Sequence, residues 1–161
     1  MREAKPKVYV ETSVISYLVA RRNQRDLIVA ANQELTVEWW EHRRQDFELY
    51  VSAVVLAEVA RGNEQFAAAR TTVAQQLTIV EISESATALA DSLVEHAGLP
   101  PTAYEDAIHI AVAATGGMDY LLTWNCRHIA NAMIIPRVNR VIRSFGYEPP
   151  LIYTPQQLME E

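Results

Sequence analysis

Short hydrophobic runs and longer amphipathic segments follow one another along the chain. The short runs are rich in Val, Ile, Leu and Tyr, which is typical of strands, and the longer segments repeat apolar residues at the spacing of a helix face. The predicted strands are 7–10, 47–52, 78–82 and 119–124. The predicted helices are 12–21, 25–45, 53–62, 64–77, 83–98 and 102–117, with short ones at 127–131, after Pro136 and from Thr154 onward. Thr12 is the expected cap of the first helix.

This alternation of strands and helices predicts the fold class. Strands separated by helices pair in parallel through right-handed crossovers, so helices cover both faces of the sheet. We therefore expect an α/β protein with three α/β/α layers around a central, mostly parallel sheet. A chain of 161 residues without a repeat or a linker fits a single domain over residues 1–161, with a core at about 7–135 and a C-terminal helical extension at 136–161.

Composition narrows the class of protein. Half of the residues are hydrophobic, but the longest apolar runs are far shorter than the roughly 18 residues of a membrane span, so no membrane segment is expected. Cys126 is the only cysteine, which excludes an intrachain disulfide and a Cys-rich zinc site. Because the first residues also lack the apolar region of a signal peptide, we expect a cytoplasmic protein.

The charge of the chain limits the ways in which it can bind nucleic acid. A net charge of −6 argues against binding through a broad basic surface. A local basic patch stays open, because Arg137, Arg140 and Arg143 recur every three residues. A solvated helix face is the favoured interpretation of this repeat.

Four oxygen-bearing side chains are notable for their positions. Glu11 directly follows the first predicted strand and Asn125 follows the fourth, and sites in open parallel sheets form outside the carboxyl ends of the strands. Glu58 and Asp106 lie in helices that are otherwise apolar, where an unpaired carboxylate costs several kcal/mol. If the four side chains converge, they form an oxygen cluster with up to three negative charges, which suits Mg²⁺ or Mn²⁺.

Each carboxylate also has a simpler interpretation. Glu11 can favour the start of the following helix through its charge. Arg61 is a possible intrahelical partner for Glu58, three residues away. Glu105 can be the inward-facing acid in place of Asp106. The joint order and placement of the acids is therefore a stronger signal than any one of them.

Other catalytic chemistries find little support in the sequence. Glycines at 62, 98, 116, 117 and 146 match no phosphate-binding loop, and neither Ser13 nor Cys126 has the flanking residues of a nucleophile. The segment WNCRH contains Cys126 and His128, but a single pair of this kind is a weak metal motif. A helix start is the favoured interpretation of that segment.

In the order of its motifs, the chain resembles PIN-domain proteins of the VapC toxin type. The motifs are VETSVISYL with Glu11, Thr12 and Ser13, VVLAEVARG with Glu58, YEDAIHIA with Asp106, and LLTWN with Thr123 and Asn125. The resemblance covers roughly residues 7–135. It implies a PIN-like α/β/α fold, an endoribonuclease activity that depends on Mg²⁺ or Mn²⁺, RNA as substrate, and a toxin role alongside a cognate antitoxin. A homodimer is expected on the same basis.

The resemblance also implies roles for individual residues. The residues expected at the site are Glu11, Glu58, Asp106 and Asn125 as the catalytic set, with Thr12, Ser13, Thr123 and His109 around them. Glu11 and Asp106 would hold the cation directly, Glu58 would bind it or orient the attacking water, and Asn125 would position water or a second metal. The hydroxyls would donate hydrogen bonds to carboxylates or substrate. The imidazole is expected to pack or to hold a carboxylate rather than to act as a base.

Two positions depart from the family pattern and leave an alternative function open. The first site residue of the family is usually Asp, whereas Glu11 is one methylene longer, and Asn125 lacks a charge at the fourth position. The alternative to a ribonuclease is a catalytically weak PIN-like module that binds RNA or a partner protein.

Overall fold

Five short strands, all parallel, form the centre of the fold. The structure is a computed structural model, and it describes residues 4–159. The strands are β1 (Lys7–Val10), β2 (Glu48–Val51), β3 (Thr78–Ile79), β4 (Tyr120–Leu122) and β5 (Leu151–Tyr153), and their order in the sheet is β3-β2-β1-β4-β5. Because β1 lies in the middle, its carboxyl end has a neighbouring strand on each side.

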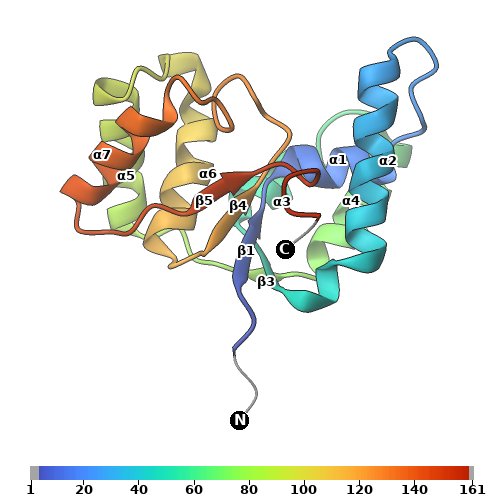
Figure 1. Ribbon diagram of the computed structural model, residues 1–161, viewed down its shortest axis with the longest axis horizontal. Coiled ribbons are helices and arrows are strands. Elements are labelled where there is room, and N and C mark those ends of the chain that lie inside the picture. The colour runs from blue at the N-terminus through green and yellow to red at the C-terminus, as the bar shows by residue number, and fades with distance from the viewer. Residues whose placement is uncertain (1–3, 160–161) are drawn as a thin grey trace.

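Helices cover the sheet on both sides (Figure 1). The helices of the first half are α1 (Thr12–Val19), α2 (Leu27–His42), α3 (Ala53–Val59) and α4 (Glu64–Gln75), and those of the second half are α5 (Glu84–His96), α6 (Tyr104–Thr115) and α7 (Ile135–Ser144). Short 3₁₀ helices span Arg44–Asp46 and Pro101–Ala103. α5 packs against α6 and α7, whereas α1 packs against α2, α3 and α4. The expected three-layer α/β/α class is therefore confirmed.

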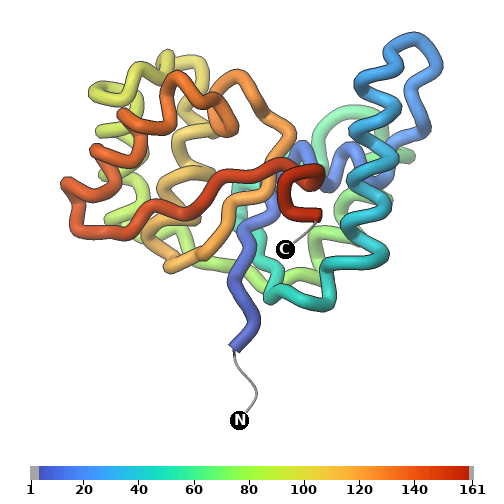
Figure 2. The backbone as a smooth tube through the Cα atoms, viewed as in Figure 1, coloured from blue at the N-terminus to red at the C-terminus, as the bar shows by residue number. Residues whose placement is uncertain are grey.

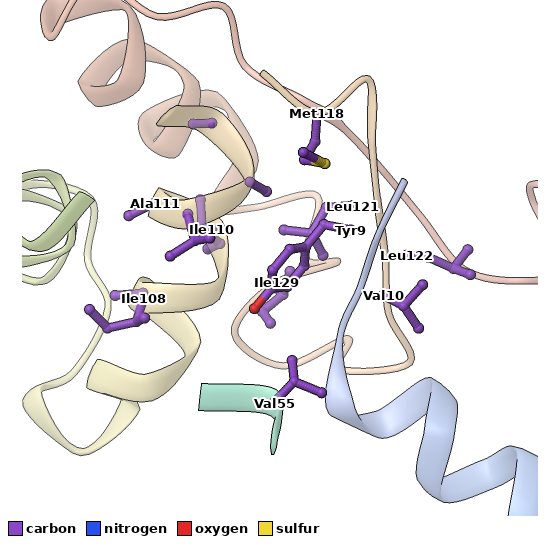
Figure 3. Close-up of a cluster of buried hydrophobic side chains, with 14 of the residues drawn as sticks. Tyr9, Val10, Val55, Ile108, Ile110, Ala111, Met118, Leu121, Leu122 and Ile129 are labelled. Atoms are coloured by element: carbon purple, nitrogen blue, oxygen red, sulfur yellow. The ribbon is translucent and has the colours of Figure 1, made fainter. Parts of the chain in front are cut away.

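The central strand is buried along most of its length. Val8, Tyr9 and Val10 are fully buried, since both faces of β1 are covered by helices. Figure 3 shows Tyr9 and Val10 beside Leu121 and Leu122 of β4, with side chains of α6 packed nearby. The predominantly small residues of α6 bring its backbone close to the sheet. This packing holds the residues at the carboxyl ends of β1 and β4 on a rigid base.

The end of the chain differs from the prediction. The expected helical extension at 136–161 holds one helix, α7, and then the strand β5, which pairs with β4. The backbone trace in Figure 2 runs back across the sheet edge beside β4. A three-residue strand after two prolines is too short to produce a periodic pattern, and the open edge of β4 decides its conformation.

Two predicted short helices are turns in the structure. Residues 126–129 and 155–158 form hydrogen-bonded turns, so the helices predicted at 127–131 and from Thr154 are wrong over the described residues. The part of the second prediction at 160–161 lies outside them. Side chains that satisfy the backbone locally explain both turns: the Asn125 Oδ1 accepts from the backbone nitrogens of Arg127 and His128, and Thr154 Oγ1 accepts from Gln157 N.

No helix in the described range 4–159 is long and apolar enough to cross a membrane.

Candidate active site

The site residues gather at the carboxyl ends of the two central strands, β1 and β4. Strand order reverses here, because the chain moves from β1 to β2 and β3 on one side and then returns to β4 and β5 on the other. A crevice at such a reversal is the usual ligand site of an open parallel sheet. Glu11 follows β1, Thr123 follows β4, and α3 and α6 bring Glu58 and Asp106.

Glu11 is a buried carboxylate that joins two strand ends. It is 5% exposed and caps α1, with its Oε2 accepting from the backbone nitrogen of Ser13 at 3.0 Å. Its Oε1 accepts from the hydroxyls of Ser13 and Thr123, both at 2.5 Å. The expectation that Thr12 caps the helix is therefore wrong, because Glu11 supplies the cap and Thr12 turns its hydroxyl to Glu58 instead.

Glu58 forms an ion pair with a buried histidine. Its Oε1 accepts from Thr12 Oγ1 at 2.7 Å and from Nε2 of His109 at 2.5 Å. The other ring nitrogen of His109, Nδ1, contacts the Tyr9 hydroxyl at 2.7 Å, and that hydroxyl contacts Ser52 Oγ at 2.8 Å. Four elements, β1, α3, α6 and the end of β2, are thus joined by one chain of hydrogen bonds.

In this chain of hydrogen bonds every group has a partner, whether the His109 ring is neutral or charged. The carboxylate of Glu58 is an acceptor, so Nε2 carries a proton in both states. When His109 is neutral, Tyr9 donates to Nδ1 and Ser52 donates to Tyr9; when His109 is charged, Nδ1–H donates to Tyr9 and Tyr9 donates to Ser52. Burial raises the pKa of Tyr9 far above its ordinary value, so its hydroxyl stays neutral throughout.

The interaction between Glu58 and His109 shifts their pKa values in opposite directions. Burial raises the pKa of Glu58, but the hydrogen bond and charge of His109 outweigh this and hold its pKa below the ordinary 4.5. Burial likewise lowers the pKa of His109, but the hydrogen bond to Glu58 and the charges of Glu11, Glu58 and Asp106 hold its pKa above the ordinary 6.5. Each partner therefore favours the charged form of the other.

We expect the stabilisation by the Glu58–His109 pair to depend on pH. The contribution of His109 is fully present below pH 6.5 and is lost as the pH rises through its raised folded-state pKa. The contribution of Glu58 is present above pH 4.5 and is lost as the pH falls through its lowered folded-state pKa. The substitution His109→Gln should therefore lower the melting temperature most between pH 4.5 and 6.5. The exposed His42→Gln is the control, and a constant difference from pH 5 to 9 would contradict the prediction.

Asp106 and its neighbour Glu105 have different partners. Asp106 Oδ2 lies 3.0 Å from Nδ1 of His128, and its side chain is 20% exposed. Glu105 forms a two-bond ion pair with Arg61, and its side chain is 47% exposed. Arg61 follows the end of α3 and pairs across to α6, so the expected intrahelical partnership with Glu58 is not formed. Glu105 also lies close enough to Glu58 to interact with it, at the rim of the same site.

The segment after β4 contacts Glu11 and the start of α1. Thr123 is fully buried, and its Oγ1 also accepts from the backbone nitrogen of Asn125 at 2.9 Å. The backbone nitrogen of Trp124 donates to Ser13 Oγ at 2.8 Å, which ties the segment to α1. The side chain of Asn125 accepts from the backbone of the following turn, at 3.2 Å from Arg127 and 3.0 Å from His128. Sequence reasoning considered His128 only as part of a weak metal motif in the segment WNCRH and did not place it at the site, whereas the structure brings it to Asp106.

Three carboxylates lie near the imidazole ring of His109. The charges of Glu11, Glu58 and Asp106 all raise the pKa of His109, so all three lie within electrostatic range of that buried ring. In residues 4–159 no three His, Cys, Asp or Glu side chains are grouped to hold a metal ion, since carboxylate oxygens of Glu11 and Glu58 are turned to hydroxyls and His109. A cavity of about 880 Å³ lies at the other end of the sheet, beside Lys7 and Leu151, away from these carboxylates.

Comparisons with known proteins identify the fold and the family of the chain. Among solved structures, VapC20 of Mycobacterium tuberculosis, a sarcin-ricin loop cleaving toxin, is 16% identical with a TM-score of 0.57, over 75% of this chain and 92% of that chain. VapBC2 of Rickettsia felis, determined bound to a DNA fragment from its promoter, is 14% identical with a TM-score of 0.51, over 92% of this chain and 98% of that chain. At these identities the likeness shows a shared fold. No curated protein matches the sequence. The family profile of the PIN domain matches residues 8–130, which is more than half of the chain, and the protein therefore belongs to the PIN-domain family.

Proposed function

We propose that this protein is an endoribonuclease that depends on Mg²⁺ or Mn²⁺ and serves as the toxin of a toxin-antitoxin pair. The observation that carries the proposal is the gathering of Glu11, Glu58 and Asp106 near one buried imidazole, at the strand-order reversal of a PIN fold. Three like charges at one place repel one another, and a divalent cation relieves that repulsion. The VapC20 neighbour, an RNA-cleaving toxin by its description, supports the same reaction class.

The chemistry of the donor set fits a hard divalent cation. Oxygen ligands are those that Mg²⁺ and Mn²⁺ prefer. Among the described residues, Oε2 of Glu58 and Oδ1 of Asp106 have no hydrogen bond, and both side chains are 20% exposed. Glu11 accepts three hydrogen bonds, one fewer than the roughly four acceptor sites of a carboxylate. These three residues would hold the cation, which when bound lowers the pKa of a coordinated water and screens charge on the phosphate.

The surrounding residues hold these carboxylates in place. His109 and Thr12 fix the same oxygen of Glu58, so the other oxygen keeps one orientation toward the site. Ser13 and Thr123, which are 110 positions apart in the sequence, both fix Oε1 of Glu11, and the backbone nitrogen of Ser13 holds its Oε2. A ribonuclease needs such preorganisation, because its groups act only within about 0.5 Å of the productive geometry.

Cleavage of RNA should require the added metal. We expect purified protein to degrade total RNA with Mn²⁺ or Mg²⁺ and to stop when EDTA is present. The double variant Glu58→Gln/Asp106→Asn is the matched control, since it removes two charged oxygens without changing side-chain size. Cleavage that neither EDTA nor the double substitution reduces, or no cleavage by the unaltered protein in Mn²⁺ and Mg²⁺, would overturn the proposal.

We propose two protein partners for this chain, a cognate antitoxin and a second copy of the chain itself. VapBC2 was determined on promoter DNA, and its name supports a cognate antitoxin as the partner of this chain. We further propose that the protein works in the cytoplasm as a homodimer. A small open reading frame beside the gene, whose product co-purifies with this chain and stops RNA cleavage, is the expected finding. Light scattering at several concentrations tests the homodimer.

The second candidate is a PIN-like module that binds RNA or a partner protein without cleaving. The observation that favours it is that Glu11 accepts three hydrogen bonds as a helix cap and as a link between two strand ends, which is a structural role. RNA binding by a gel-shift assay together with no cleavage in Mn²⁺ would select this candidate.

A further inference from the structure

We propose that His128 is a positioning residue that holds the carboxylate of Asp106, and that Asn125 acts by building the turn that carries His128. The inference rests on the proposed function, because it assigns roles within the site of that reaction. It replaces the direct role for Asn125 that the family pattern implies.

The side-chain oxygen of Asn125 is committed to its own turn. Its Oδ1 accepts from the backbone nitrogens of Arg127 at 3.2 Å and His128 at 3.0 Å. A carbonyl oxygen has two lone pairs, so these two bonds use its acceptor capacity. Its backbone nitrogen is held by Thr123 Oγ1, and its backbone oxygen accepts from Ala130 at 2.8 Å. These hydrogen bonds all link Asn125 to other residues of the segment 123–130. Asn125 therefore fixes the shape of that segment.

The turn places His128 against the site. Nδ1 of His128 lies 3.0 Å from Oδ2 of Asp106, which belongs to α6, so the contact spans two elements that are 22 residues apart. An ionised carboxylate only accepts, so the proton of this bond is on Nδ1.

This bond selects which oxygen of Asp106 remains available. Oδ2 is held by the imidazole, while Oδ1 has no hydrogen bond among the described residues. His128 is 23% exposed and Asp106 20%, so the contact is shielded from water for most of its surface. Partners that orient a metal-binding side chain change metal affinity by about 10–100-fold when they are lost. His128 would orient Asp106 in this way.

Paired variants separate the two ring nitrogens. The amide nitrogen of Asn can occupy nearly the position of Nδ1 in His, whereas the amide nitrogen of Gln reaches nearly to that of Nε2. We expect His128→Asn to bind Mn²⁺ within about threefold of the unaltered protein, and His128→Gln to bind about 10-fold more weakly or worse. The measurement is calorimetric titration with Mn²⁺, with melting temperatures without metal showing that both variants are folded.

A double-variant cycle tests the role of Asn125. If Asn125 acts only through His128, then Asn125→Ala and His128→Ala weaken Mn²⁺ binding by similar factors, and the double variant is no weaker than either one. Factors that multiply would instead show two independent roles and overturn the assignment of Asn125.

The outcomes distinguish this inference from the proposed function. Rescue by Gln and not by Asn would make Nε2 the working atom and overturn the inference. Unchanged Mn²⁺ affinity in His128→Asn, His128→Gln and His128→Ala would overturn it as well, with the ribonuclease proposal intact if the unaltered protein cleaves RNA. If the unaltered protein neither binds Mn²⁺ nor cleaves RNA, the proposed function fails and this inference fails with it.

Discussion

Asp106→Asn should abolish Mn²⁺-dependent RNA cleavage while leaving the metal-free protein folded and more resistant to heat. The substitution removes one of the three negative charges near His109 and keeps the size of the side chain. The remaining oxygen of Asn still accepts from Nδ1 of His128, so the local contact survives. Losing a charged oxygen at the site should lower the cleavage rate by at least about 100-fold. Reduced repulsion among the carboxylates should raise the melting temperature without metal.

Glu105→Gln is the matched control for this prediction. Glu105 is the neighbouring acid, and its ion pair with Arg61 is exposed to solvent, so its loss should change stability little. We expect cleavage by this variant to stay within about twofold of the unaltered protein, in line with the small weight of a rim charge. Normal cleavage by Asp106→Asn combined with loss in Glu105→Gln would move the ligand role to Glu105.

Substitutions of Glu11 should separate a working ligand from a helix cap. Glu11→Ala removes the acceptor of three hydrogen bonds in a buried position and should destabilise the fold by about 2 kcal/mol while ending cleavage. Glu11→Asp shortens the side chain by one C–C bond, which exceeds the tolerance of about 0.5 Å for catalytic geometry, so the rate should fall. In the structure the longer arm reaches both Ser13 and Thr123, as a site adapted to Glu requires.

Glu11→Gln is the control for side-chain length in these experiments. It keeps the reach of Glu and one acceptor oxygen but removes the charge, so it should lose cleavage with a smaller loss of stability than Glu11→Ala. Cleavage rates in Mn²⁺ and urea denaturation of all four proteins provide the comparison. Equal cleavage by the unaltered protein and Glu11→Ala would show that this carboxylate is only a cap. A rate above the unaltered protein in Glu11→Asp would indicate a site that has decayed.

Local sequence patterns were sufficient to predict the class of fold and the positions of the candidate residues. The periods of strand and helix are properties of neighbouring residues, so four of the five strands and the placement of Glu11 after the first one follow from the chain itself. The fifth strand does not, because Leu151–Tyr153 is extended only through pairing with the edge of β4. Short helices predicted after β4 and after Thr154 failed for a related reason, since side-chain contacts to the backbone stabilise turns there.

The sequence by itself determined which chemistry is possible: oxygen-bearing side chains at the ends of strands, acids in apolar helices, and one cysteine. Only the tertiary structure decided which atoms meet. Thr123 reaches Glu11 across 112 residues, and His109 reaches Tyr9 across 100. Such contacts depend on strand order and on helix packing over the whole chain, and a buried polar group takes whichever partner the packing brings within reach. For this reason the pairing of Asp106 with His128, and of Arg61 with Glu105 rather than Glu58, becomes visible only in the folded chain.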